Sequence, residues 1–160
     1  MILNEVGISK GALYWHFAKK EDIFEEAFEY CYQKILEHSR VDIDENAPAI
    51  DCLKKRLKNI VTLNKKDPHC IIFLIKFVLF NTKYSDSFLL KELYTDIVKF
   101  IKKGLANKEI VDLPESFLVF NEMYIIGVKF IEYLNKYPET YENEALIDKI
   151  NHFLHKSMQA

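Results

Sequence analysis

The sequence predicts an all-α protein, and three observations favour that fold class. Apolar residues recur at three- and four-residue spacing along most of the chain, which is typical of helices and not of strands. Only four Gly and four Pro occur among the 160 residues, so few positions break a helix. With 49% hydrophobic residues, the chain can also bury a sizeable core, and disorder is not expected.

The predicted helices follow one another with short breaks. Residues 1–6 are expected to be the tail of a helix that Gly7 ends, and Ser9 is suited to cap the next helix. A longer helix is predicted over residues 20–38, and an acidic loop follows it. Further helices are predicted over residues 49–65, 69–82, 86–107, 114–136 and 143–158.

Charge and cysteine content limit the possible functions. A net charge of -2 and a pI near 6.2 argue against coating nucleic acid through overall charge, so any DNA contact must be local. Cys31, Cys52 and Cys70 form no pair at metal-ligand or redox spacing, and we interpret them as small buried residues of a cytoplasmic protein. The longest apolar run, residues 70–80, falls short of the roughly 20 residues of a membrane helix. No secretory leader is expected.

The most informative stretch is residues 7–17. Leu13 and Phe17, four residues apart, would form the inward face of a short helix. Gly11 costs about 0.8–1.0 kcal/mol relative to Ala in a helix and would let the backbone approach a surface closely. The outer face, where a recognition helix meets DNA, carries Lys10, Gly11, Ala12, Tyr14, Trp15 and His16. The pattern predicts a helix-turn-helix segment, and the alternative is an aromatic patch in an ordinary helical protein.

In its order of Gly, Ser, Lys, Gly, Leu and Tyr, this stretch resembles the recognition helix of the TetR/AcrR family of transcriptional regulators. The resemblance implies that the first residues of the helix reach base edges, while its aromatic residues and histidine contact phosphates, the DNA backbone or a thymine methyl. A lysine at the start of the next helix would hold a phosphate. The implied DNA-binding set is Ser9, Lys10, Gly11, Ala12, Tyr14, Trp15, His16 and Lys20.

Two departures from the family pattern carry expectations of their own. The family's helix-turn-helix normally starts with a complete helix and the front of a positioning helix, whereas this chain begins inside the latter at Met1. We therefore expect an N-terminally truncated DNA-binding segment, with Leu13 and Phe17 partly exposed, that binds DNA weakly or not at all in this form. Lys19 stands where the family often has a Ser or Asn cap. Because its ammonium cannot accept a hydrogen bond, the start of the next helix is expected to fray.

The apolar residues 69–80 extend nearly all round the predicted helix, as in a helix that is buried on several sides or lines a cavity. The TetR likeness implies a small effector held among the helices of residues 49–107. We expect an apolar or amphipathic effector, with Lys76 as a possible counter-ion for an acidic one. The alternatives are plain core aromatics and a lysine that reaches solvent. The candidate lining residues are Phe73, Lys76, Phe77, Phe80, Tyr94 and Phe100.

Residues 117–134 are too apolar for a helix that is covered on one face only. Gly127 would allow a close helix approach, and the final helix offers a matching apolar stripe. The TetR likeness implies that these two helices pair with their copies in a second subunit as a four-helix bundle. Packing within the monomer alone is the alternative. The candidate interface residues are Phe120, Met123, Tyr124, Gly127, Phe130, Leu134, Leu146, Ile150, Phe153 and Leu154.

Other patterns predict no chemistry. A basic cluster comprises Lys54, Lys55, Arg56 and Lys58. We interpret this cluster as the solvated face of a helix. His152 and His155 lie three residues apart but lack a third ligand, so no metal is expected. Neither a glycine-rich phosphate loop nor a nucleophile elbow occurs, so we expect neither an enzyme nor a cofactor.

The predicted organisation is a truncated helix-turn-helix DNA-binding domain at residues 1–28, followed by a TetR-type effector-binding and dimerisation domain at residues 29–160. The predicted function is a homodimeric repressor that a small-molecule effector releases from operator DNA. The alternative is a dimeric small-molecule-binding or protein-interaction module that does not contact DNA in this form. No membrane partner is expected.

Overall fold

The computed structural model describes residue 11, residues 15–80 and residues 91–160, with only the backbone described at residues 77–80. Within these ranges the secondary structure is helical apart from an isolated bridge between Ile110 and Gln159, which confirms the all-α prediction. The helix predicted over residues 1–6 and its junction at Gly7 and Ser9 lie outside the described residues. No helix in the described part of the chain is long and apolar enough to cross a membrane.

The described helices lie close to the predicted ranges. The run predicted over residues 114–136 is unbroken, but its middle is π-helical, which the sequence pattern did not predict. In chain order the elements are α3 (Lys20–Ser39), α4 (Ala49–Lys66), α5 (Pro68–Phe80), α7 (Lys91–Ala106), α8 (Glu115–Phe120), η2 (Asn121–Val128), α9 (Lys129–Lys136), the 3-10 helix η3 (Pro138–Glu142) and α10 (Glu144–Lys156).

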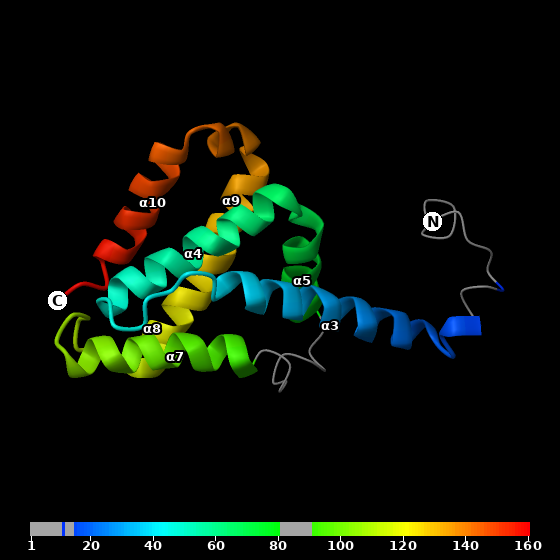
Figure 1. Cartoon of the computed structure of the whole chain (residues 1–160), viewed down its shortest axis with the longest axis horizontal. Coiled ribbons are helices and arrows are strands. Elements are labelled where there is room, and N and C mark those ends of the chain that lie inside the picture. The colour runs from blue at the N-terminus through cyan, green and yellow to red at the C-terminus, as the bar shows by residue number, and fades with distance from the viewer. Residues whose placement is uncertain (1–10, 12–14, 81–90) are drawn as a thin grey trace.

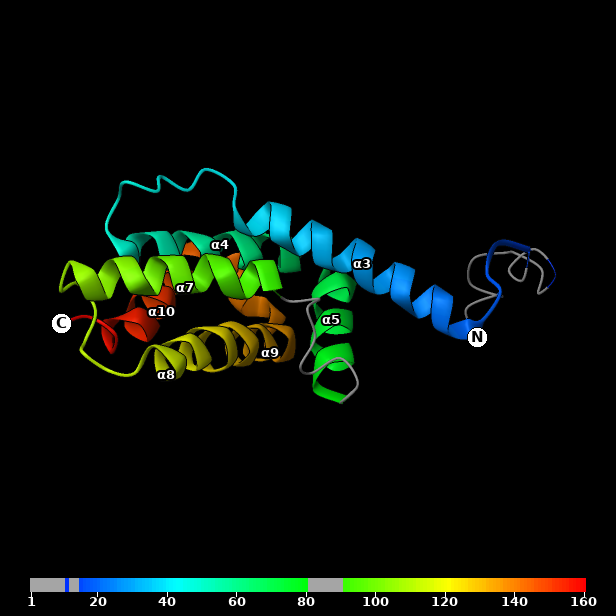
Figure 2. The same ribbon diagram turned by 90° about the horizontal axis from the view of Figure 1, so that it is seen from below.

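The centre of the helical body is α4, which packs against α3, α5, α7 and α10. Leu53 and Leu57 on α4 are buried in the shared core, where each apolar side chain of this size contributes about 1.5–3 kcal/mol. α7 runs beside α4, and the run from α8 to α9 lies below both in the view of Figure 2. Figure 1 shows α3 leaving this body and projecting toward the N-terminal residues.

The start of α3 is capped in a way that the sequence analysis did not foresee. Lys19 provides no side-chain cap. Instead its backbone N–H donates to the carboxylate of Asp22, 2.9 Å away. The carboxylate also lies in the first turn, where it interacts favourably with the helix dipole. This contact satisfies the backbone N–H of Lys19, whereas the fraying expected at this end stays a prediction.

The basic cluster on α4 is not a uniformly solvated face. Lys54 and Lys58 are half-buried, and Lys58 Nζ lies 2.9 Å from a carboxylate oxygen of Asp148 on α10. Arg56 is only 5% exposed, and its Nη2 lies 3.5 Å from the carbonyl oxygen of Leu93 on α7. The interpretation of Arg56 as solvated was therefore wrong, because α7 covers that side of α4.

Candidate functional site

The two halves of α3 differ in their exposure to solvent. Its first residues, Lys20 and Glu21, are exposed, whereas buried positions begin at Phe28 and continue to Ser39 at the other end. Twenty helical residues at about 1.5 Å each span about 30 Å. Figure 1 shows the N-terminal half of α3 standing clear of the body. The helix is thus a rigid link between the N-terminal segment and the helical body.

Four members of the predicted DNA-binding set fall within the described residues, and all four are exposed. Gly11 is helical, and Trp15, with 82% of its surface accessible, packs edge-on against the ring of His16 at a centroid distance of 4.8 Å. Lys20 places its Nζ 5.5 Å from the ring centroid of Phe24. The remaining members lie outside the described residues: Ser9, Lys10, Ala12 and Tyr14.

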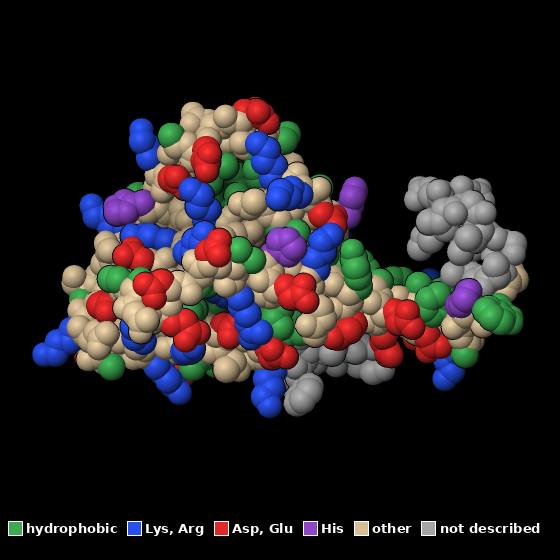
Figure 3. Space-filling model, viewed as in Figure 1, with side chains coloured by type: hydrophobic (Ala, Val, Ile, Leu, Met, Phe, Trp, Pro, Cys, Tyr) green, Lys and Arg blue, Asp and Glu red, His purple; other side chains and the backbone are tan. Residues whose placement is uncertain are grey.

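The projecting half of α3 is acidic. Glu21, Glu25, Glu26 and Glu29 are exposed along it, and Figure 3 shows red side chains gathered there. Carboxylates repel phosphate, so this part of α3 is not a surface that binds DNA. Contacts with a phosphate backbone would have to come from the residues that precede α3 and from Lys20 at its start.

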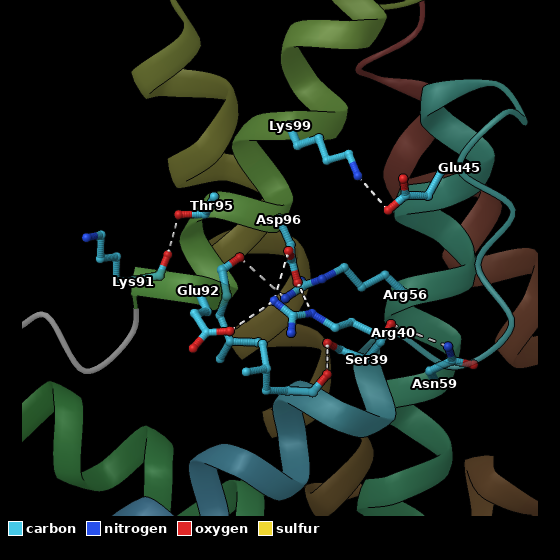
Figure 4. Close-up of polar contacts among 12 residues, drawn as sticks. Ser39, Arg40, Glu45, Arg56, Asn59, Lys91, Glu92, Thr95, Asp96 and Lys99 are labelled. Carbon is cyan, nitrogen blue, oxygen red and sulfur yellow. Dashed lines mark hydrogen bonds and ion pairs between the residues drawn. The ribbon is translucent and has the colours of Figure 1, made fainter.

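The other end of α3 is clamped to α7 (Figure 4). Arg40 donates from Nε to Asp96 Oδ2 at 2.7 Å and from Nη2 to Asp96 Oδ1 at 3.1 Å, a bidentate arrangement. A carboxylate oxygen of Glu92 lies 3.3 Å from the same Nη2. The backbone N–H of Glu92 also donates to the hydroxyl of Tyr32, at 3.1 Å. We call Arg40, Tyr32, Glu92 and Asp96 the α3–α7 clamp.

Two further contacts fix α3 to the neighbouring elements. Lys34 Nζ lies 2.6 Å from Asp67 at the start of α5, and this hydrogen bond holds the pKa of the Asp67 carboxyl below its usual value. On the α4 side, the side-chain amide of Asn59 donates to the carbonyl of Val41, just beyond the end of α3, at 2.7 Å. Movement of α3 and the residues just beyond it relative to the body therefore has to break polar contacts with α7, with α4 and with Asp67 between α4 and α5.

A buried ion pair joins η2 to α10. His155 Nε2 lies 3.3 Å from Glu122 Oε2, and both side chains are almost wholly buried. His155 Nδ1 lies 2.9 Å from the carbonyl oxygen of Asn151, which can only accept, so Nδ1 carries a proton. Nε2 then faces Glu122, and a ring protonated at Nε2 as well can pair with that carboxylate. Burial lowers the pKa of His155, but Glu122 and the Asn151 carbonyl outweigh it and raise that pKa above its usual value.

An apolar groove of about 340 Å³ lies on the outer side of the same seam between η2 and α10. Its lining residues are Asn121, Ile125, Ile126, Phe153, Leu154, Lys156 and Ser157. Phe153 is 73% exposed, and Phe117, Phe120 and Ile125 are about half exposed along the α8–η2 edge. We call these four exposed residues, with the groove, the α8–α10 face. An apolar face of this kind on a helical body is typical of an interaction surface.

The predicted effector-lining residues that the structure describes differ in burial. Phe100 is buried in the core, Phe73 is half-buried against it, and Tyr94 and Lys76 are exposed. The side chains of Phe77 and Phe80 lie outside the described residues. None of the six lines the groove between η2 and α10. Phe100 thus fills core space while Tyr94 and Lys76 lie on the surface, and the effector-lining role of the set stays a prediction.

The predicted interface residues divide into three groups. Phe120, Leu146 and Phe153 are exposed, whereas Phe130 and Leu134 are buried inside the monomer. The half-buried members are Met123, Tyr124, Gly127, Ile150 and Leu154. Phe130 and Leu134 thus face the core of the monomer, and the interface role of the set stays a prediction. The π-helix, whose i→i+5 bonds add a residue to each turn, interrupts the 3.6-residue period between α8 and α9.

Sequence reasoning missed the Glu122–His155 pair. It considered His155 only together with His152, but His152 is exposed and His155 is buried, so the two rings occupy different surroundings. Within the described residues, no group of three or more His, Cys, Asp or Glu side chains could hold a metal ion. The sequence signal that could have indicated the pair is Glu122, which lies alone within an apolar run. Glutamate is rarely buried without a partner, so this position predicts one.

The comparisons with known proteins agree with this architecture. Residues 1–27 match the family model of the bacterial regulatory proteins of the tetR family. The fold is similar to that of a solved structure from Shewanella sp. PV-4 assigned to the tetR family of transcription regulators. The TM-score is 0.72 at 19% sequence identity, and the match covers 99% of this chain and 85% of that one. A comparison with curated proteins finds no match.

The class that the fold and the N-terminal motif define is therefore an all-α, helix-turn-helix regulator. Within that class, the match over residues 1–27 supports TetR family membership, and the similarity to the solved structure agrees with it in fold.

Proposed function

We propose that this chain is a ligand-responsive transcriptional repressor that binds operator DNA as a homodimer. The observation that carries the proposal is α3, which places an exposed aromatic motif at one end and is clamped to a helical body at the other. Residues 1–28 would form the DNA-binding domain and residues 29–160 the effector-binding and dimerisation domain. The proposed role of the chain is that of a regulator and not of an enzyme.

The homodimer would form through the α8–α10 face. Exposed Phe117, Phe120 and Phe153 are costly to leave in water, and a second copy of the same face would cover them. A two-fold axis at this face would pair η2 and α10 with their copies. It would also place two recognition segments on one dimer, as a two-fold symmetric operator requires.

Effector binding would act through the α3–α7 clamp. A small apolar or amphipathic molecule bound in the body would change the position of α7, and Arg40 would transmit that change to α3. The spacing of the two recognition helices would then no longer match successive major grooves. A ligand shifts this equilibrium only by its difference in affinity for the two shapes.

Selection from random-sequence duplex DNA tests the DNA-binding part of the proposal. The protein with its N-terminal DNA-binding domain intact should enrich an inverted repeat, and Trp15→Ala with His16→Ala should lose that enrichment while the protein keeps its helical circular dichroism. A folded dimer with the intact domain that enriches no sequence would refute operator binding. It would favour the alternative, a dimeric module that binds small molecules or proteins without contacting DNA.

The dimer is tested separately by sedimentation. The wild-type chain should sediment as a dimer and Phe153→Asp as a monomer, because a buried unpaired carboxylate is costly at an apolar interface. Tyr30→Asp is the matched control, since Tyr30 is exposed on α3 away from the α8–α10 face and its replacement should leave the dimer intact. A wild-type monomer at all concentrations would contradict the proposed assembly.

A further inference from the structure

Two cysteines from different helices meet where α3 packs against α5. Cys31 lies in the buried half of α3, and Cys70 lies in the first turn of α5. The Cys70 thiol donates to the backbone carbonyl of Cys31 with an Sγ···O distance of 3.6 Å. The Cys70 sulfur therefore lies against residue 31 of α3, although 38 residues separate the cysteines along the chain.

The third cysteine provides a contrast. Cys52 on α4 is also buried, but its thiol donates to the carbonyls of Asp44 and Ala47 in the preceding loop, at 3.3 and 3.7 Å. Its polar contacts are thus with backbone carbonyls of its own N-terminal loop. Burial alone therefore does not distinguish the pair, whereas the contact of the Cys70 thiol with another cysteine does.

We propose that Cys31 and Cys70 are a redox modification site, which a small hydroperoxide converts to a disulfide that fastens α3 to α5. The proposal goes beyond the function proposed above and does not depend on it, since the bond requires neither DNA nor effector. Its consequence for regulation does rest on that function: a covalent link would hold α3, which carries the DNA-reading segment, in one position on the body.

The chemistry takes place in two steps. The Cys31 sulfur, the more exposed of the two, attacks one oxygen of hydrogen peroxide. The O–O bond breaks, water leaves and a sulfenic acid remains. The Cys70 sulfur then attacks the sulfenic sulfur, the S–O bond breaks, and the hydroxide takes the thiol proton and leaves as a second water. Two thiols are oxidised by two electrons, and one peroxide is reduced to two waters.

Packing controls the rate of this reaction. Burial and the neighbouring Cys31 raise the pKa of the Cys70 thiol to about 12, so little thiolate is present while α3 and α5 remain packed. Oxidation therefore requires a brief local separation of the two helices. The site is slow in the closed protein and faster in any state that loosens α3.

Peptide mapping of the oxidised full chain tests the proposal. After treatment with hydrogen peroxide, non-reducing digestion should yield a Cys31–Cys70 cross-linked peptide, and dithiothreitol should remove it. The melting temperature of the oxidised chain should rise by about 5 °C or more, because the bond closes a long loop in the unfolded state. Cys52→Ser should form the bond as the wild type does, whereas Cys31→Ser and Cys70→Ser should not.

Two results would overturn the inference. One is oxidation of Cys31 and Cys70 to separate sulfinic acids with no cross-linked peptide. The other is a cross-link that persists in Cys70→Ser and joins Cys31 to Cys52. Because the readout on the wild-type chain is a covalent bond, it remains decisive even where a serine variant folds poorly, and failure to bind DNA would not affect it.

Discussion

Two of the charged contacts that join helices in this protein differ in almost every physical respect. The Arg40–Asp96 pair of the α3–α7 clamp is partly exposed, with ideal bidentate geometry. The Glu122–His155 pair is buried in the core of the body. An exposed pair can be broken at little cost, whereas a buried charge that loses its partner is expensive. The clamp is thus suited to a movable joint, and the buried pair to a fixed one.

The largest expected effect follows from removing one charge of the buried pair. Glu122→Ala should lower the free energy of unfolding by about 3–5 kcal/mol, because it leaves His155 buried without a counter-charge. Urea unfolding measures this loss. Glu132→Ala removes an exposed partner of Lys129 and should change stability by only about 0.5 kcal/mol or less.

A double replacement sharpens the interpretation of that loss. Glu122→Leu with His155→Leu removes both charges and should recover much of the stability lost in Glu122→Ala, since an apolar pair needs no counter-charge. If the double variant is as unstable as the single one, the loss comes from packing and not from charge.

The buried pair also predicts a pH dependence. The pKa of His155 is raised in the folded protein, so its contribution to stability is fully present below the usual histidine pKa of 6.5. That contribution is lost as the pH rises through the higher folded value. The melting temperature should therefore fall from pH 6 toward pH 8, and His155→Leu should flatten this part of the profile. The same slope in both proteins would assign the pH dependence to other groups.

A smaller loss is expected where α7 approaches α4 most closely. A Cβ on Gly104 would lie 2.5 Å from Ile110 Cδ1, 2.7 Å from Ile110 Cγ1 and 3.0 Å from Ala49 Cβ, all in the core. Gly104→Ala should cost about 1–3 kcal/mol from overpacking, partly offset by about 1 kcal/mol of better helix propensity. Urea unfolding measures the net loss. Ile110→Val in the same chain should restore part of it, and no restoration would place the strain elsewhere.

The contrast between exposed and buried charged groups also explains which features the sequence could predict. Helical periodicity located α3, α4 and α10 closely, and exposure at Trp15 and His16 agrees with the motif, because these features depend on local pattern. Helical periodicity could not predict the burial of Arg56 or of Glu122, because the burial of a charged side chain depends on which other helix covers it. The π-helix likewise shifted Phe130 and its neighbours out of the predicted register, because a 3.6-residue period holds only while the hydrogen-bond register is constant.

The smallest effect on stability, and the most informative one about regulation, is expected at the clamp. Arg40→Ala should cost about 1 kcal/mol or less, because the Arg40 side chain is 45% exposed and solvent screens its ion pairs. It should nevertheless increase hydrogen exchange along the C-terminal half of α3, where Tyr32 would be the one remaining clamp contact. Lys129→Ala, which removes a similarly exposed ion pair on α9, should leave α3 exchange unchanged. Equal exchange in the Arg40→Ala variant and the wild type would mean that the Arg40 ion pairs do not hold α3, so a shift of α7 could not move α3 through Arg40.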